Sequence, residues 1–171
     1  MASIIARLGE DAAENWAKGV VANFARKPQG NDTAQIEAVA SGQCRVAVVN
    51  SYYVARFIGS EDEDKNTIGE KIDVLFPNQS TSGTHVNVSG AGLTKYGPNS
   101  ENAKTLIAFL LREESQKIFA LGNNEYPIVD GVEASGPVGA LGDFKEDTLP
   151  VAALGENQAA AVRIFDRAGW Q

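Results

Sequence analysis

The feature that most constrains the fold is an alternation of helix-like segments with short runs typical of buried strands. Apolar side chains recur at helical spacing in the longer segments, whereas the shorter runs are β-branched or alternate in polarity. Helices are predicted over 9–24, 101–121 and 157–168. Strands are predicted over 45–49, 71–76 and 84–89. Because strands alternate with helices along the chain, the pattern predicts an α/β fold.

Two further helices are predicted from capping chemistry at their first residues. Asp32 is the expected N-cap of one helix, and Gln35 three residues later completes a pattern like a capping box. Asn50–Ser51 offers the same chemistry directly after the strand predicted at 45–49, so a short helix is expected over 52–58. The acidic run 61–64 lacks the spaced ligands and glycine of a calcium loop, and it predicts a solvated helix start or loop.

The charge balance excludes several classes of partner. The 171 residues include 15 basic and 22 acidic side chains, which gives a net charge of −7. This sign argues against nucleic acid as a partner, because binding there depends on Lys and Arg, and against an anionic membrane surface. The apolar runs are too short to span a bilayer. The opening residues 1–5 show none of the features of a secretory signal peptide.

The cysteine and histidine content limits the possible metal and catalytic sites. Cys44 is the only cysteine, which excludes an internal disulfide and a cysteine-cluster metal site, and a buried structural thiol is favoured over a reactive one. The only histidine, His85, is expected to be structural and hydrogen-bonded rather than a ligand. A hydrolytic set of Thr33, Ser51 and His85 lacks a nucleophile elbow, so the chain is not predicted to be an enzyme. A site for a hard metal must therefore use oxygen ligands.

The adjacent tyrosines Tyr52 and Tyr53 are the main site candidates. They follow a predicted buried strand and open a helix, the position that faces the ligand crevice in open α/β sheets. A tyrosine with a pKa of about 10 ionises at neutral pH only with help, which a helix N-terminus and a highly charged cation supply. Ferric iron is the natural candidate. From the residues alone, a packing role for the two rings stays open beside the metal-binding role.

Three neighbouring candidates have competing interpretations. Arg56 lies one helical turn after the tyrosines, where it either steadies a phenolate or pairs with the acidic run 61–64; the ion pair is favoured. Tyr96 and Tyr126 lie beside prolines, which favours loop packing over ligation.

Short segments along nearly the whole chain match, in order, the sequence pattern of a known family. They are Asn23–Arg26, Gly30–Thr33, Asn50–Arg56, Phe76–Gln79, Gly83–Gly90, Gln116–Phe119, Gly122–Pro127, Leu141–Asp147, Leu154–Asn157 and Asp166–Trp170. In these segments the chain resembles the ferric-iron-binding periplasmic substrate-binding proteins of ABC importers. Full-length relatives carry further sequence, including a signal peptide, ahead of the matched part. The chain therefore resembles their C-terminal portion.

The resemblance implies a fold, a function and a pair of ligands. It implies the second lobe of a type II periplasmic-binding-protein-like clamp, plus the crossover segment of the first lobe, with Fe(III) held in the cleft mainly by tyrosine oxygens. It assigns Tyr52 and Tyr53 as the second-lobe metal ligands. The implied function is the ferric-iron-binding component of an ABC-type iron uptake system, truncated to its C-terminal half and periplasmic. The implied partners are the ferric ion and the membrane subunits of the importer.

The same resemblance implies a division of the chain into three segments and leaves an alternative function open. It implies a second-lobe core over 1–88, a crossover segment over 89–127 that packs on the first lobe, and a return to the second lobe over 128–171. Two phenolates do not fill the coordination sphere of ferric iron, so binding by this chain alone is expected to be incomplete or absent. The alternative is a folded remnant without metal binding, whose exposed helix face would favour a homodimer.

Overall fold

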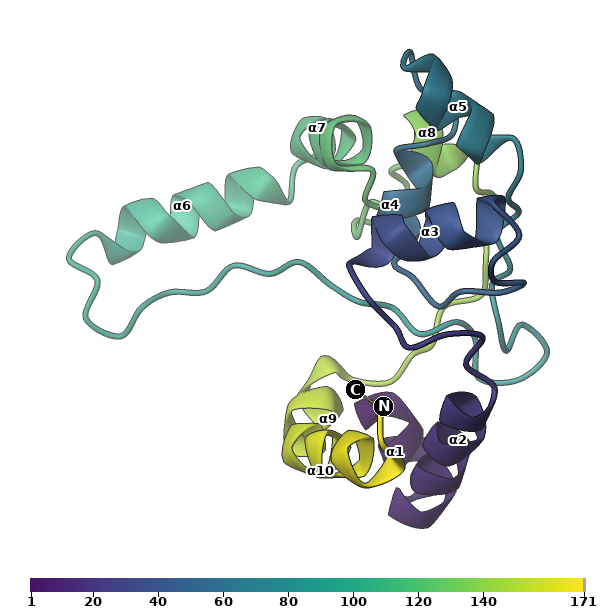
Figure 1. Ribbon diagram of the computed structural model, residues 1–171. Coiled ribbons are helices and arrows are strands. Elements are labelled where there is room, and N and C mark those ends of the chain that lie inside the picture. Colours follow the sequence, from purple (N-terminus) through teal and green to yellow (C-terminus); the bar gives the residue numbers. More distant parts are fainter. Residues whose placement is uncertain (171) are drawn as a thin grey trace. The chain divides into compact units, whose positions relative to one another are not determined.

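The computed structural model describes residues 1–170, which divide into two compact units (Figure 1). Unit 1 contains 1–30, 76–86 and the residues from 145 onward, and unit 2 contains 31–75 and 87–144. No helix in the described part of the chain combines the length and apolar content needed to cross a membrane.

Unit 1 is built from four helices, three of which (α1, α2 and α10) supply one apolar core. They are α1 (Ala2–Leu8), α2 (Glu10–Ala22), α9 (Val151–Glu156) and α10 (Gln158–Ala168). The buried side chains are Ile5, Ala13, Ala17, Ala160, Ala161 and Ile164. The helices predicted over 9–24 and 157–168 are confirmed as α2 and α10, whereas α1 was not predicted. Gly9 separates α1 from α2 with a φ of 83°, a conformation that glycine adopts without steric cost.

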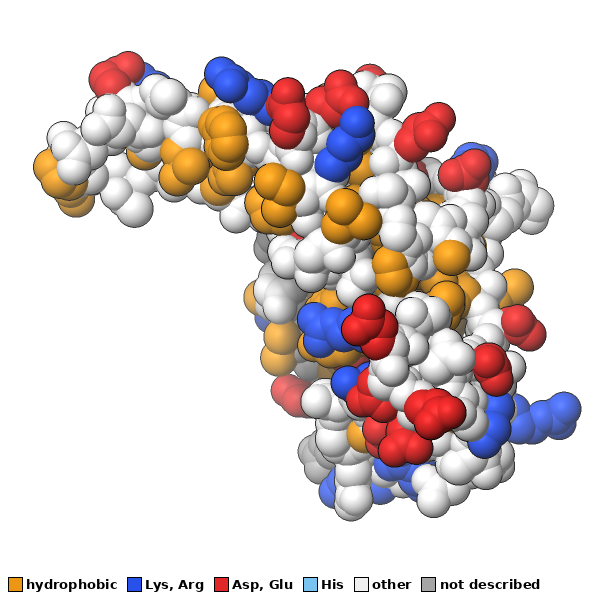
Figure 2. Space-filling view, turned by 90° about the horizontal axis from the view of Figure 1, so that it is seen from above, with side chains coloured by type: hydrophobic (Ala, Val, Ile, Leu, Met, Phe, Trp, Pro, Cys, Tyr) orange, Lys and Arg blue, Asp and Glu red, His pale blue; other side chains and the backbone are white. Residues whose placement is uncertain are grey.

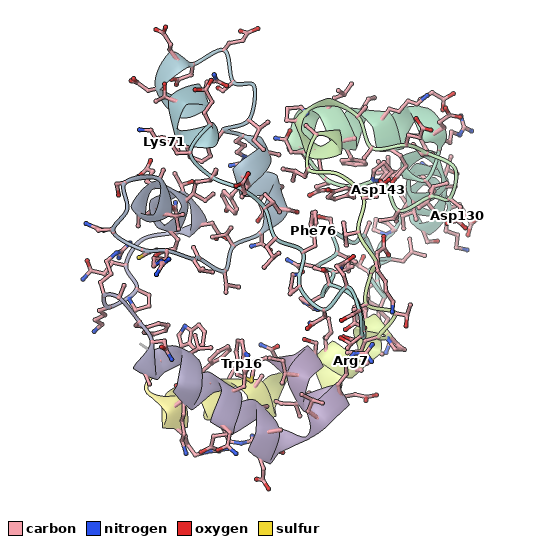
Figure 3. All side chains as sticks on the ribbon, turned by 90° about the vertical axis from the view of Figure 1, so that its right-hand side faces the viewer. Arg7, Trp16, Lys71, Phe76, Asp130 and Asp143 are labelled. Atoms are coloured by element: carbon pink, nitrogen blue, oxygen red, sulfur yellow. The ribbon has the colours of Figure 1, made fainter. Side chains whose placement is uncertain are left out.

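An aromatic cluster ties the last described residue to α2. The Trp170 ring lies 6.1 Å from Trp16, 5.2 Å from Phe24 and 5.0 Å from Phe165, measured between ring centroids. Figure 3 shows Trp16 on the ribbon of α2 and Arg7 on α1. Edge-to-face and stacked aromatic pairs stabilise beyond the area that they bury, so this cluster holds the end of the chain in unit 1.

Ion pairs between distant segments reinforce unit 1. Arg7 Nε donates to Asp147 Oδ2 over 2.9 Å, and this pairing lowers the pKa of Asp147. Glu14 on α2 accepts from Arg167 Nε on α10 over 2.8 Å and also pairs with Lys18. These two hydrogen bonds, with Arg167 contributing most, lower the pKa of Glu14 to about 2.

We expect Glu14→Gln to weaken the acid dependence of unit 1 stability. The folded pKa of Glu14 lies below its ordinary value of 4.5, so its stabilisation is present above that pH and is lost as the pH falls toward 2. Melting temperatures followed by circular dichroism between these pH values should fall less steeply in the variant. Glu156→Gln is the matched control, because Glu156 makes no ion pair among the described residues. Equal slopes in Glu14→Gln and wild type would contradict the assignment.

Unit 2 holds six helices and two small cores. The helices are α3 (Asp32–Ala40), α4 (Ser51–Ala55), α5 (Glu63–Gly69), α6 (Ser100–Leu110), α7 (Glu113–Asn123) and α8 (Gly136–Gly139). One core contains Ile36, Val54 and Phe57, and the other contains Ala55, Ala120 and Val138. Because Val54 and Ala55 enter different cores, the short helix α4 is anchored from two sides.

The cap of α3 differs from the prediction by one residue. Asn31, not Asp32, is the N-cap, and its side-chain oxygen accepts from the Ala34 N–H over 3.2 Å. Gln35 Nε2 donates a hydrogen bond to the Asn31 carbonyl over 3.3 Å. Asp32 is thereby free to make a longer-range contact, described below. The acidic run 61–64 does begin a helix, since Asp62 accepts from the Lys65 N–H and caps α5.

The single helix predicted over 101–121 is wrong, because the structure has two helices there. α6 ends at Leu110 and α7 begins at Glu113. The buried Ser115 donates to the Phe109 carbonyl over 2.7 Å, and the buried Gln116 donates to the Leu110 carbonyl over 2.8 Å. Gln116 thereby satisfies the Leu110 carbonyl at the end of α6, and Ser115 gives a second donor to the Phe109 carbonyl, which also accepts from the Arg112 N–H.

The predicted strands form no ladder within residues 1–170, so the α/β class is not confirmed. The described backbone contains one isolated bridge, between Thr84 and Glu146. Segment 71–76 alternates as predicted, with Ile72 and Val74 packed on the Ile36–Val54–Phe57 core. The buried strand predicted over 45–49 is wrong in its burial, because Val49 packs on that core whereas Val46 and Val48 are each 81% exposed. The periodicity of segment 71–76 is therefore that of a strand, whereas partner strands are not found among the described residues.

Candidate metal centre

Tyr52 and Tyr53 lie in the first turn of α4, directly after the extended segment that ends at Asn50. Their ring centroids are 4.4 Å apart, and the ring planes are tilted by 34°. Both residues are half-buried, and Tyr53 packs against the core that contains Val54. The neighbouring Tyr53 hydroxyl is the largest influence on the pKa of Tyr52. Two tyrosine side chains are thus held side by side by a short, well-anchored helix.

A polar network fixes the start of α4 from two other segments of unit 2. Asp32 Oδ1 accepts from the Asn50 backbone N–H over 2.8 Å and from Asn50 Nδ2 over 3.3 Å. Asn87 Nδ2 donates to Asn50 Oδ1 over 3.5 Å. The first turn of α3 therefore holds the residue that leads into the tyrosine pair. Apart from the polar residues at the two helix starts, no feature of the sequence predicts this contact.

Arg56 lies over both tyrosine rings. Its guanidinium carbon is 5.7 Å from the Tyr52 centroid and 4.9 Å from the Tyr53 centroid, within the range of cation–π attraction. The favoured prediction, an ion pair with the acidic run 61–64, is wrong: within residues 1–170 no such pair forms. The observed position matches the other interpretation, in which the positive charge of Arg56 favours a phenolate.

Opposing effects act on the pKa of Tyr52. The neighbouring Tyr53 hydroxyl raises the pKa most, followed by partial burial and by the nearby charges of Tyr53 and Asp32, while Arg56 lowers it. The net direction is upward, so Tyr52 is a neutral phenol at neutral pH. A metal that binds this oxygen must displace its proton, which makes metal affinity increase with pH.

We expect Tyr53→Phe to lower the pKa of Tyr52, because the substitution removes the largest cause of its elevation. Nuclear magnetic resonance of ring-labelled tyrosine across the alkaline range measures this pKa directly. Arg56→Gln should shift the same pKa in the opposite direction, since a cation that favours the phenolate is lost. An unchanged or higher Tyr52 pKa in Tyr53→Phe would show that the two hydroxyls are not coupled.

A cavity of about 500 Å³ lies beside the C-terminal end of α4 in unit 2. Its lining includes Thr33, Arg56 and Lys65, with backbone from the turn that follows α4. Arg56 therefore borders this cavity and also covers the tyrosine rings.

The other predicted candidates do not gather around the tyrosine pair. Tyr126 donates to the Gly142 carbonyl over 2.9 Å, and burial raises its pKa to about 12, so its packing role is confirmed. Tyr96 is 87% exposed, which contradicts loop packing. Cys44 is only half-buried. His85, in unit 1, has a pKa lowered mainly by burial and forms no hydrogen bond among the described residues, contrary to expectation.

Acidic, cysteine and histidine side chains provide no alternative metal centre in the described part of the chain. No group of three or more such residues there is arranged to hold a metal ion. Tyr52 and Tyr53 are thus the candidate ligands that the structure brings together.

Known proteins that are similar to this chain in sequence and in structure include several iron-uptake and ferric-binding proteins. The chain is 47% identical over its whole length to Iron uptake protein A1 of Synechocystis, covering 48% of that protein. A Trichodesmium protein (IdiA, FutA) solved in complex with iron and citrate superposes with a TM-score of 0.96 at 46% identity, over 99% of this chain and 54% of that one. Apo FutA2 of Synechocystis gives a TM-score of 0.94 at 45% identity, over 99% and 55%.

These matches define both the fold and its extent. The chain has the fold of part of the ferric-binding proteins, a type II periplasmic-binding-protein fold, and spans about half the length of the relatives that it matches. The homodimer anticipated from the sequence finds no support in these relatives. Residues 1–140 match the family described as bacterial extracellular solute-binding protein. The chain therefore belongs to the bacterial extracellular solute-binding protein family.

Proposed function

We propose that the chain is the ferric-iron-recognising half of a substrate-binding protein, with Tyr52 and Tyr53 as metal ligands. The observation that carries the proposal is the pair of adjacent phenol rings, 4.4 Å apart between centroids, that lies beneath Arg56. The pair occurs in a chain whose similar structure from Trichodesmium was solved with iron and citrate.

The chemistry of the pair suits a hard, highly charged cation. Phenolate oxygen is a hard donor, and the charge of a bound ferric ion reverses the elevation of the Tyr52 pKa by favouring the ionised form. Asp32 holds Asn50 and so fixes the backbone that presents the tyrosines. Two ligands leave coordination positions open, and we propose that water, an anion or the other half of the clamp fills them.

The proposal also covers where the protein acts, and it has one alternative. The protein would act in the periplasm and deliver iron to the membrane subunits of an ABC importer, without catalysing a reaction. The alternative is a folded remnant that binds no metal. This alternative rests on the small number of ligands that the described residues bring together.

Titration of the purified chain with ferric citrate tests the proposal. Ligation by tyrosinate is expected to produce a visible phenolate-to-iron charge-transfer band that saturates with added iron. The band should weaken as the pH falls, because protons compete for the two phenol oxygens. A folded sample that gives no band would favour the remnant.

A further inference from the structure

Arg56 carries a positive charge that has no anionic partner in the described part of unit 2. Its guanidinium lies over the faces of the Tyr52 and Tyr53 rings, and among residues 1–170 it forms neither a salt bridge nor a hydrogen bond. A guanidinium presents five N–H donors in a planar fork, which matches the geometry of a carboxylate. These donors are available to a ligand.

The cavity at the C-terminal end of α4 offers such a ligand a place beside Arg56. Its volume of about 500 Å³ is typical of small-molecule sites, which occupy about 300–1,000 Å³. Lys65 of α5 supplies a second cation to the wall. Polar groups come from Thr33, Ser60 and Asn124. The cavity therefore combines two cations with neutral groups that can donate hydrogen bonds.

The charge of this lining is not opposed from within the cavity. None of the described residues that line it is acidic. Lys65 pairs with Asp62 over 3.2 Å, but the two side chains are 54% and 48% exposed, where an ion pair is weak and easily shared. Figure 2 shows acidic and basic side chains intermixed over the face that it presents, without a broad basic field. Anion binding at the cavity would therefore depend on its own two cations.

We infer that this cavity is a second binding site in unit 2, which takes a small dicarboxylate between Arg56 and Lys65. One carboxylate accepts the paired N–H groups of the guanidinium, and the other accepts from the Lys65 ammonium. Neither Tyr52 nor Tyr53 lines the cavity, so the ligand is a neighbour of the candidate metal centre and not one of its coordinating groups.

The shape and composition of the cavity favour a dicarboxylate over a single inorganic ion. An inorganic anion would leave most of a 500 Å³ space unfilled. The apolar part of the wall comes from Ala55, Phe57 and Pro137, which suits the carbon chain between two carboxylates. A ligand with charge at both ends and methylene groups between them uses the whole lining.

Calorimetric titration of the full 171-residue chain with succinate, at constant ionic strength and without iron, tests the binding. We expect a single site with a Kd below about 1 mM. In nuclear magnetic resonance spectra, the signals of the Arg56 Nε–H and of the Lys65 side chain should shift and saturate together. Butane-1,4-diol, which keeps the carbon chain without its charges, should not bind.

Lys65→Gln locates the second carboxylate. Loss of a charge-assisted hydrogen bond should weaken succinate binding by at least about tenfold. Lys104→Gln is the matched control, because Lys104 is also an exposed lysine of unit 2 paired with an acidic residue three positions earlier, and it does not line the cavity. The absence of saturable binding, equal affinity in Lys65→Gln and wild type, or equal binding of the diol would each overturn the inference.

Occupation of the cavity would also affect the tyrosine pair. A carboxylate on Arg56 neutralises the charge that lowers the pKa of Tyr52, so it opposes ionisation of this phenol and, by linkage, metal binding. This coupling, unlike the binding itself, rests on the proposed function. Succinate added at a fixed concentration of ferric citrate should weaken the charge-transfer band more in wild type than in Lys65→Gln.

The comparison of these two proteins separates the cavity from simple chelation. Succinate removes iron from solution equally in both samples, so the difference between them reports the occupied cavity. Equal weakening of the band would contradict the coupling. A chain that gives no band at all would contradict the proposed tyrosine ligation, whereas the iron-free calorimetry would still decide whether the cavity binds a dicarboxylate.

Discussion

Replacing both Tyr52 and Tyr53 with phenylalanine is expected to abolish ferric binding. The substitution removes two oxygen atoms while keeping both rings, so the 4.4 Å ring contact, the packing of Tyr53 and the position of Arg56 can be retained. Residues that only orient a ligand commonly contribute about 10- to 100-fold in metal affinity. Loss of both ligand atoms should therefore weaken binding by more than about 100-fold. Competition with citrate, followed by the charge-transfer band, measures the change.

Tyr96→Phe is the matched control for that experiment. It removes one phenol oxygen from a residue that is 87% exposed and lies outside the site. The control should retain wild-type affinity and band intensity. If Tyr96→Phe weakened the band while the double variant kept it, the ligand assignment would be wrong.

Ile164→Ala is expected to cause a large loss of stability. Ile164 on α10 is fully buried in the core that it shares with Ile5 and with alanines of α2 and α10. Truncations of this kind cost about 2–5 kcal/mol. The free energy of unfolding, measured with urea, should fall by this amount.

A substitution on the exposed side of the same helix provides the comparison. Val162 is 49% exposed, so Val162→Ala should change the free energy of unfolding by less than about 0.5 kcal/mol. Similar losses for the two variants would indicate that α10 does not pack on α2 as described.

Local sequence signals predicted the elements whose stability is itself local. Periodicity located α2 and α10, and capping chemistry located α3 and α4 to within one residue of their starts. The break between α6 and α7 was missed because it depends on Ser115 and Gln116 turning back to carbonyls six residues away. Helical periodicity does not report such contacts.

Pairing between segments was the part of the fold that sequence could not supply. Segment 71–76 was recognised by its alternation and segment 45–49 by its β-branched run, although the burial predicted for 45–49 was wrong at Val46 and Val48. A ladder depends on a partner that the residues of these segments do not specify. Predicting the α/β class required the further assumption that such a partner lies within the chain. Among residues 1–170 it is not found.

The tyrosine pair of the candidate site was singled out from the sequence, but the contacts around it were not. Tyr52 and Tyr53 were identified by their place after an apolar run and by resemblance to ferric-binding proteins. The hydrogen bonds from Asn50 to Asp32 join residues 18 positions apart. The Arg56 side chain lies over the tyrosine rings instead of pairing with the nearby acidic run 61–64. Both outcomes depend on tertiary packing around α4.

The most direct test of the account is an anomalous diffraction map from crystals of the chain soaked with ferric citrate. Data collected at the iron absorption edge locate the metal independently of any spectroscopic band. We predict a single strong peak within coordination distance of both Tyr52 and Tyr53 hydroxyl oxygens. A peak held by carboxylates elsewhere, with none at the tyrosine pair, would contradict the proposed centre.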